Sequence, residues 1–317
     1  SSTFSTISAY GGGLKSNIWT LLVMNELTDD TLKKNSFANI ISMSGVSGGS
    51  IGLSNFAAIV HTDTLKSERA KKIKEIGLSN TLSHEINHFL GRDLMREFVP
   101  FEVFCGKDRS YFSMRANAKL AFGDNYECNV KKSYSKLWSE LHTKYKFPVL
   151  FSNSKSTSYY YGYTSPFKDL ETLPGGIDIA NNKNPINNNE EVPVFYDAIS
   201  ASNRFPLISP AAIIEGKGHF VDGGYFENSG QLTNLSFLQK VNLDTAKHVS
   251  IIITNSKSDY LRHFLNEFYH DSEPRTAETK SNTEISSILG ALINLDGLPT
   301  HLEEKENTYA IHYYKIV

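Results

Sequence analysis

A serine held between glycines is the first feature of this chain whose residue types could perform chemistry. The pentapeptide Gly45-Val46-Ser47-Gly48-Gly49 fits the pattern G-x-S-x-G, in which the serine is a nucleophile. The motif needs a sharp turn between a strand and a helix, because that turn lifts the hydroxyl above the end of a sheet. The helix that begins there contributes free N–H groups and a partial positive charge. Glycine and serine are also common turn residues, so the pentapeptide alone fits a purely structural turn as well.

A nucleophilic serine also needs an oxyanion hole. Gly11, Gly12 and Gly13 follow an apolar segment and can expose backbone N–H groups with no side chains in the way. The run matches neither of the glycine-rich nucleotide patterns, which argues against nucleotide binding. Lys15 follows two residues later and could bring a cation near a phosphate.

The base has to come from another part of the chain, and Asp222 is the candidate. It follows a short strand-like segment and precedes two glycines in the stretch GHFVDGGYFENSG, residues 218–230. A turn at this point would fix the carboxylate at the end of a strand. The other interpretation is a plain β-turn, because Asp-Gly is a common turn pair.

Strands and helices must position these residues, and the sequence predicts them in the required order. Residues 4–10 and 37–44 are expected to form strands, and the second is apolar enough to be buried on both faces. Helices are expected over 14–27 and 50–60, and in the first of them Ile18, Leu21, Leu22 and Met24 should point mostly inward. A strand, a glycine loop and a helix, twice in succession, indicate a parallel α/β sheet.

The rest of the chain predicts additions to this core. Residues 67–98 are expected to be largely helical, and 148–154 and 248–254 are expected to be strands. Polar stretches at 180–191 and 270–282 are expected to be connections, and the second leads into an apolar helix over 284–295. No internal repeat or clear linker is visible. We therefore expect one domain over 1–317, with core motifs in 8–230 and a C-terminal elaboration in 245–317.

A tyrosine-rich run at residues 159–163 fits two descriptions. It is either a buried strand or an exposed aromatic loop that, together with Phe167, would meet lipid. The composition leaves both open.

Composition excludes several classes of protein. The chain has 317 residues, of which 40% are hydrophobic, and a formal net charge of −2, so no broad basic field is available for nucleic acid. Cys105 and Cys128 are the two cysteines, which leaves one disulfide possible but no cysteine zinc site. No apolar run reaches the length of a membrane span, and no secretory signal is apparent. The sequence begins without methionine, so a preceding segment or anchor would not be visible in it.

Three motifs, taken in order along the chain, resemble those of the patatin-like phospholipase family, which shares its catalytic core with the mammalian cytosolic phospholipases. GGGLK at 11–15 resembles the oxyanion loop, and GVSGGS at 45–50 resembles the nucleophile elbow. DGG at 222–224, followed by Asn228, resembles the motif of the catalytic aspartate. The segment ISASNRFPLISPA at 199–211 resembles the family's sequence shortly before that aspartate.

The resemblance implies a three-layer α/β fold, with a mostly parallel central sheet and helices on both faces. It also implies a Ser–Asp dyad in which Ser47 attacks an ester carbonyl and Asp222 takes its proton, without a histidine. The oxyanion hole would comprise Gly11, Gly12, Gly13 and Gly48. Lys15 stands where many members have arginine, and a lysine binds phosphate less specifically. Desolvation of Asp222 would raise its basicity.

A competing motif lies at His84-Glu85-Ile86-Asn87-His88, which fits the zinc-protease pattern H-E-x-x-H. On a helix the two histidines share one face and can bind one metal ion. The longer form of the pattern requires a third histidine, and Leu94 stands at that position. A surface helix with two histidines is therefore favoured over a zinc site.

The sequence therefore predicts a lipid acyl hydrolase of phospholipase A, lysophospholipase or esterase type. Its substrate would be a lipid or phospholipid ester, and neither a cofactor nor calcium is required. An intracellular location or peripheral contact with a membrane is expected, without nucleic acid as a partner. The alternatives are a zinc metalloprotease at His84 and His88, and a lipid-binding scaffold without catalysis.

Overall fold

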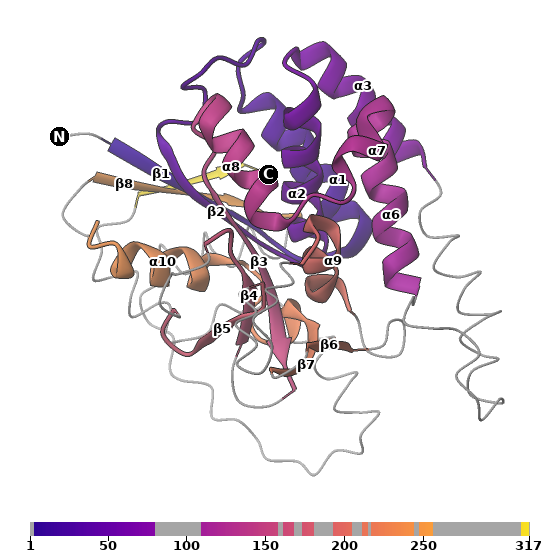
Figure 1. Ribbon diagram of the computed structural model, residues 1–317. Helices are drawn as coiled ribbons and strands as arrows, with labels where there is room; N and C mark the ends of the chain where they lie inside the picture. Colours follow the sequence, from indigo (N-terminus) through magenta and orange to yellow (C-terminus); the bar gives the residue numbers. More distant parts are fainter. Residues whose placement is uncertain are drawn as a thin grey trace, which may run out of the picture.

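A nine-stranded sheet forms the centre of the computed structural model (Figure 1). Seven strands follow one another in the order β5-β4-β3-β2-β1-β8-β9. Their bounds are Gly176–Asp178, Tyr161–Thr164, Val149–Ser156, Ile40–Val46, Thr3–Ala9, Lys247–Ile253 and His312–Ile316 in that order. The structure describes residues 3–79, 109–157, 161–167, 173–180, 193–204, 211–214, 217–243, 247–255 and 312–316.

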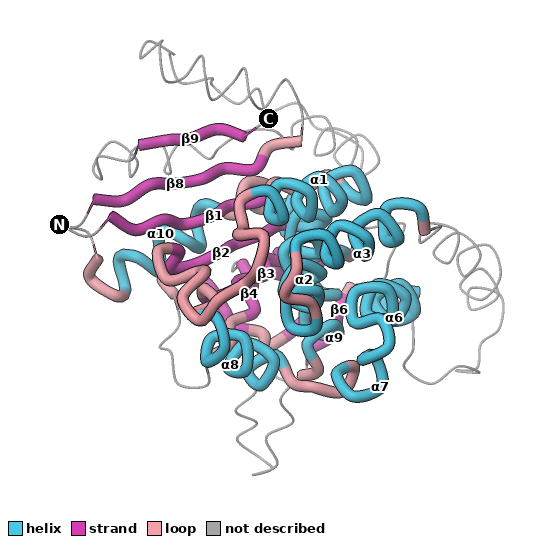
Figure 2. Tube along the Cα trace, turned by 90° about the horizontal axis from the view of Figure 1, so that it is seen from above, coloured by secondary structure: helices cyan, strands magenta, loops and turns pink. Residues whose placement is uncertain are grey.

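Strands β3, β2, β1, β8 and β9, which are adjacent in this order, run parallel to one another. The antiparallel pairs are confined to the other side of the sheet, beginning at β3. There β3 pairs antiparallel with β4 and with β7, Gly218–Asp222. A short strand β6, Ala212–Ile214, completes a hairpin with β7. Figure 2 shows β9, β8, β1 and β2 lying side by side. The predicted parallel α/β sheet is thus confirmed.

Helices cover both faces of the sheet. On one face α1 (Gly13–Glu26), α2 (Ser47–Thr62), α6 (Arg109–Phe122) and α8 (Tyr134–Tyr145) bury the main apolar core against β1 and β2. The opposite face carries α10, Gln231–Lys240, seen apart from the other helices in Figure 1. Three more helices are α3 (Lys66–Leu78), α7 (Tyr126–Asn129) and α9 (Phe195–Ser200), and short 3-10 turns span Gly123–Asn125, Ala201–Asn203 and Gly223–Tyr225. The three-layer α/β class expected from the sequence is confirmed.

Strand β2 is buried on both faces, as the sequence predicted, although its face toward α10 carries buried serines. Met43 points into the main apolar core, whereas Ser42 and Ser44 point toward α10. Ser42 donates to Asn234 of α10 at 2.7 Å, and Asn234 donates to Ser8 of β1 at 2.8 Å. The α10 layer is therefore attached to the sheet by buried hydrogen bonds as well as by apolar contacts.

Burial corrects one expectation and decides between two descriptions that the sequence left open. Leu22 of α1 was expected to point inward, but it is 46% exposed. The described part of the tyrosine-rich run lies in strand β4, in which Tyr161 and Tyr163 are buried against Phe151 and α10. These two tyrosines are core residues and do not form an exposed aromatic patch.

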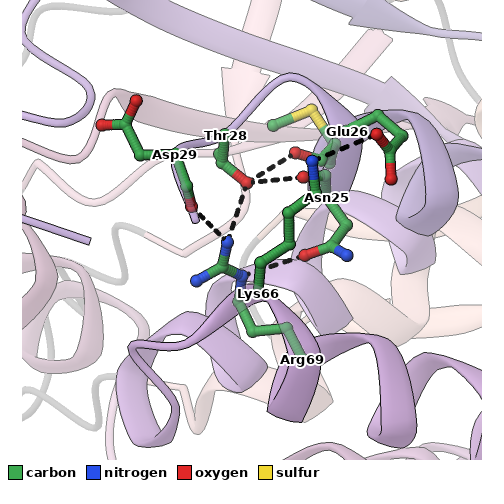
Figure 3. Close-up of polar contacts among 7 residues, drawn as sticks. Asn25, Glu26, Thr28, Asp29, Lys66 and Arg69 are labelled. Atoms are coloured by element: carbon green, nitrogen blue, oxygen red, sulfur yellow. Dashed lines mark hydrogen bonds and ion pairs between the residues drawn. The ribbon is translucent and has the colours of Figure 1, made fainter. Parts of the chain in front are cut away.

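Helix α3 is attached to the end of α1 by the fully buried guanidinium of Arg69 (Figure 3). Arg69 donates to the side chains of Asn25 and Thr28, and to the carbonyl oxygens of Thr64 and Asp29. Burial lowers the pKa of Arg69 from its usual value, but the surrounding oxygen atoms satisfy the charge. This contact stabilises the helical layer that supports α2.

Several sequence-based predictions lie outside the described residues. They include the His84–His88 motif, Cys105, the connection at 270–282 and the helix at 284–295. The helix predicted over 67–98 is described only as α3, up to Leu78. Cys128 is a free, exposed thiol.

Candidate active site

Ser47 lies at the turn between β2 and α2, and its backbone is in the left-handed region with φ = 49°. That conformation is strained for any residue except glycine. The flanking positions must be glycine because other backbone segments lie too close to leave room for a side chain. A Cβ at Gly45 would lie 2.6 Å from the backbone of Ser50, and one at Gly49 would lie 2.5 Å from the carbonyl oxygens of Ala9 and Tyr10 at the end of β1. The sharp strand-to-helix turn predicted for this motif is therefore present.

The register of the sheet aligns the glycine loop with the nucleophile turn. Ala9 of β1 lies opposite Gly45 of β2, so Gly11 follows β1 at the same level as Ser47 follows β2. A Cβ at Gly11 would lie 3.3 Å from the Cβ of Ser47. At Gly48 a Cβ would overlap the carbonyl oxygen of Gly13. The two loops are thus in direct contact, and only glycine permits that contact.

Asp222 is brought close to Ser47 by the pairing of its strand, β7, with the edge of β3. Strand β2 ends with Val46 opposite Asn153. Beyond that point β7 pairs with the same edge of β3, and Asp222 lies opposite Ser154. Because β7 is antiparallel to β3, its carboxyl end meets the carboxyl end of β2. Figure 1 shows β7 at the end of β3. The side chains that face α2 from this part of β3 are those of Ser152 and Ser154, so Asp222 faces α2 as well.

The carboxylate of Asp222 is buried, with 4% of the residue exposed. Burial raises its pKa to about 6, while hydrogen bonds from the Ser47 hydroxyl and the Gly224 N–H act in the opposite direction. The Gly224 N–H donates to Oδ1 at 2.8 Å. The backbone N–H of Asp222 donates to the carbonyl of Arg204 at 2.9 Å, which fixes the turn that carries it.

The hydroxyl of Ser47 has one proton and two acceptors within reach. One is the Asp222 carboxylate, and the other is Oδ1 of Asn203 at 3.3 Å. The bond to Asn203 is long and neutral, so the carboxylate is the stronger acceptor. The backbone N–H of Ser47 donates to the hydroxyl of Ser202 at 3.0 Å, and this bond helps to hold the strained turn.

Three backbone N–H groups in the two loops around Ser47 have no acceptor in the described part of the chain. They belong to Gly12, to Gly13 at the start of α1, and to Gly48 in the first turn of α2. Gly11, which was also expected to donate to the oxyanion, instead donates its N–H to the Asn228 carbonyl at 3.0 Å. Free N–H groups at a helix start are oriented to stabilise negative charge. Lys15 is exposed in the first turn of α1, beside the same loop. A cation there is unfavourable for the helix dipole, which points to a role other than helix stability.

No histidine with a described side chain bonds to Ser47 or Asp222. His219 lies on β7, three residues before Asp222, so its exposed side chain points to the opposite face of the strand. Other described histidines bond elsewhere: His61 to Glu140, His142 to the Phe147 carbonyl and His248 to Thr6. A serine–histidine pair is therefore not formed within the described residues.

Several residues that support the site were not identified from the sequence. Nδ2 of Asn153 donates to the carbonyl of Gly45 and to Ser44, both at 2.8 Å, and so braces the strand before the nucleophile. Glu227 is buried and accepts from the N–H groups of Ser229 and Gly230, just before α10, and burial raises its pKa. Asn255 contacts the glycine loop. Asn255 follows the end of β8, where ligands gather in parallel sheets, and that position is the one signal that could have found it. Asn153 lies within β3 and carries no such signal.

Neither a metal cluster nor a membrane-spanning helix is found among the residues that the structure describes. Within them there is no group of three or more side chains suited to a metal ion. None of the described helices combines the length and apolar character needed to cross a bilayer.

Comparison with known proteins gives a distant structural likeness. No protein-family model matches the chain, and no curated protein matches it. Among solved structures, VipD from Legionella pneumophila is similar with a TM-score of 0.40 and 10% sequence identity, over 99% of this chain and 61% of that one. The chain thus spans about three fifths of the length of that structure. A score at this level is a loose likeness, so the functional interpretation depends on the residues of the site.

Proposed function

We propose that this chain is a serine hydrolase that cleaves acyl esters of lipids through an acyl-enzyme on Ser47. The observation that carries the proposal is the convergence of Ser47 and the buried carboxylate of Asp222 beside unbonded N–H groups. A nucleophile, a base and an oxyanion hole are the parts that acyl transfer requires. The likeness of three motifs to the patatin-like phospholipases supports the same conclusion.

In the first step, the Ser47 oxygen attacks the ester carbonyl carbon while Asp222 accepts the hydroxyl proton. The carbonyl oxygen becomes an oxyanion, which the N–H groups of Gly12, Gly13 and Gly48 stabilise. The leaving alcohol then takes the proton from Asp222 as its bond to the acyl carbon breaks. A pKa of about 6 suits both proton transfers, because it lies close to neutral pH.

In the second step, water attacks the acyl-enzyme, and Asp222 accepts one of its protons. The tetrahedral intermediate collapses, the proton returns to the Ser47 oxygen, and a carboxylic acid leaves. The start of α2 at Ser47 adds the partial positive charge of a helix N-terminus to both oxyanions.

We further propose that the acyl ester substrate is a lipid. Lys15 is exposed beside the glycine loop and is available to a phosphate group. Ile213, on the hairpin that carries Asp222, is 74% exposed, which suits peripheral contact with a lipid surface. Glycerophospholipids, lysophospholipids and neutral lipids are all compatible with these features.

The test is labelling with a fluorophosphonate, followed by mapping of the modified residue by mass spectrometry. Wild type should be labelled on Ser47, and Ser47→Ala should not be labelled. Asp222→Asn should lose turnover of short acyl esters while it keeps the fold. Labelling at another residue, or an active Ser47→Ala variant, would contradict the proposal. A folded wild type with neither labelling nor esterase activity would favour a lipid-binding scaffold.

A further inference from the structure

The carbonyl and N–H groups of Gly11 are held by two asparagines that lie far from it in the sequence. Its N–H donates to the backbone carbonyl of Asn228 at 3.0 Å, and its carbonyl accepts from Nδ2 of Asn255 at 2.6 Å. Gly12 follows with φ = 145°, a conformation that side-chain-bearing residues rarely adopt. A Cβ at Gly12 would overlap the Asn255 amide. Asn255 therefore lies directly against the loop that supplies the unbonded N–H groups.

Sheet register explains why Asn255 lies there. Ala9 pairs with Ile253 of β8 on one side and with Gly45 of β2 on the other. Asn255, Gly11 and Ser47 each come two residues after one of these three aligned residues. They therefore stand in one row across the carboxyl edge of the sheet. Gly11 occupies the middle of this row.

The peptide group between Gly11 and Gly12 is planar, so the direction of the Gly11 carbonyl fixes the direction of the Gly12 N–H. In a trans peptide the carbonyl and the following N–H point opposite ways, and the described chain has no cis peptide. Because Asn255 holds the carbonyl of Gly11 toward β8, the N–H of Gly12 points away from β8, toward the side of Ser47. That is the direction in which an oxyanion on the acylated serine would form.

A peptide between two glycines has little steric resistance to turning over, because neither residue carries a Cβ. A hydrogen bond to its carbonyl therefore decides which way the N–H faces. We infer that Asn255 is a positioning residue that keeps the Gly12 N–H directed into the oxyanion hole. This inference rests on the proposed hydrolase function, and it assigns to Asn255 no contact with the substrate.

The variant Asn255→Asp tests the direction of the hydrogen bond without a large change in shape. An ionised carboxylate accepts but cannot donate, so the variant side chain would repel the Gly11 carbonyl and attract the Gly12 N–H. The peptide would then turn over and remove one donor from the oxyanion hole. Once protonated, the carboxyl group can donate again, so the defect should be reversed at low pH.

The experiment measures kcat and KM for a water-soluble acyl ester between pH 5 and pH 8. Asn255→Asp should lower kcat by on the order of ten- to a hundredfold at pH 8, and KM should change by less than about threefold, as expected for loss of an oxyanion donor. The ratio of its kcat to that of wild type should rise toward one as pH falls, because the titration of Asp222 cancels in the ratio. Asn255→Ala should show a comparable loss of kcat at every pH.

The matched control is Asn129→Asp, which removes an amide-to-carbonyl bond of 2.9 Å from Asn129 of α7 to Asn125 in the preceding 3-10 turn. It should leave kcat and its pH profile unchanged. Melting curves separate instability from misdirected hydrogen bonding, and Asn255→Ala serves if the aspartate variant does not fold. Wild-type kcat in both folded Asn255 variants, or a kcat ratio for Asn255→Asp that does not change with pH, would overturn the inference while leaving the hydrolase intact. An inactive, unlabelled wild type would instead overturn the proposed function, and this inference with it.

Discussion

Asp222 lies opposite Ser154 on β3, one position beyond the point at which β2 ends. The nucleophile turn and the aspartate turn therefore meet at the same edge of one strand, although they are far apart in sequence. The arrangement depends on backbone register, which side-chain substitutions do not easily change. It follows that variants at the site can be expected to fold, and that their effects can be read as effects on chemistry.

The pH dependence of activity should follow Asp222. Its pKa is raised to about 6 by burial, and the base must be ionised to accept the Ser47 proton. The value of kcat/KM should therefore rise about tenfold per pH unit below that value and level off above it. The measurement is a pH–rate profile with an uncharged, water-soluble ester. A profile that is flat between pH 5 and 7 would contradict Asp222 as the base.

Burial of Asp222 should also cost stability at neutral pH. A pKa raised from 3.8 to about 6 means that the folded state binds more protons in this interval, so stability falls as pH rises through it. The difference corresponds to about 3 kcal/mol above pH 6. Asp222→Asn keeps an acceptor for the Gly224 N–H and removes the charge. It should exceed wild type in stability at pH 7.5 by up to about this amount, and the gain should vanish below pH 4.

Chemical denaturation at pH 7.5 and at pH 3.5 measures this difference. Asp197→Asn provides the comparison, because that carboxylate forms an ion pair with Arg115 at 2.9 Å and its replacement removes a favourable contact. It should be neutral or destabilising at pH 7.5. Equal stability of Asp222→Asn and wild type at both pH values would show that the buried charge carries no cost.

The strained backbone of Ser47 should be visible in stability measurements. At φ = 49° a residue with a Cβ costs on the order of 1 kcal/mol relative to glycine. Ser47→Gly should therefore be more stable than Ser47→Ala by about that amount, and neither variant should react with a fluorophosphonate. Thermal melting of the two variants side by side measures the difference. If Ser47→Ala proved the more stable, the turn would not be strained.

Contact between the two glycine loops should make Gly48 intolerant of any side chain. A Cβ at Gly48 would overlap backbone atoms of Gly13, so Gly48→Ala must push the loops apart. We expect a loss of roughly 1–3 kcal/mol in stability, as for other overpacked sites, and loss of fluorophosphonate labelling. Gly77→Ala is the matched control, because a Cβ in that position of α3 meets only ordinary contacts near 3.7 Å. It should be neutral or stabilising, and its labelling should equal that of wild type.

Much of the core could be predicted from sequence because local signals are strong there. Glycine runs after apolar segments marked the ends of β1 and β2, and helical spacing marked α1 and α2. The prediction that failed concerns the covered face of α1, because Leu22 was expected to point inward but is 46% exposed. Strand β2 is buried on both faces as predicted, but its sequence did not show that Ser42 and Ser44 bond to groups of β3 and α10, which only the tertiary structure brings near.

The residues of the candidate site also divide into those that local motifs predicted and those that only the tertiary structure reveals. Ser47 and Asp222 carry recognisable local motifs, and the structure brings them together. Asn255 follows an ordinary apolar strand, and its significance comes from the pairing of β8 with β1, which the sequence does not reveal. Asn203 lay within a segment of recognised resemblance, but its contact with the Ser47 hydroxyl required coordinates.

Lys15 provides a way to determine the lipid class. Its exposed ammonium group stands beside the glycine loop, where it can contact a phosphate of the substrate. Because exposed ion pairs contribute about 0.2–1 kcal/mol, Lys15→Gln should raise KM for a phosphate-bearing acyl ester by a few-fold. KM for an uncharged ester should not change. Lys34→Gln, which removes an equal charge from another exposed position, should affect neither substrate. Equal KM values for wild type and Lys15→Gln on both esters would favour a neutral lipid as the substrate.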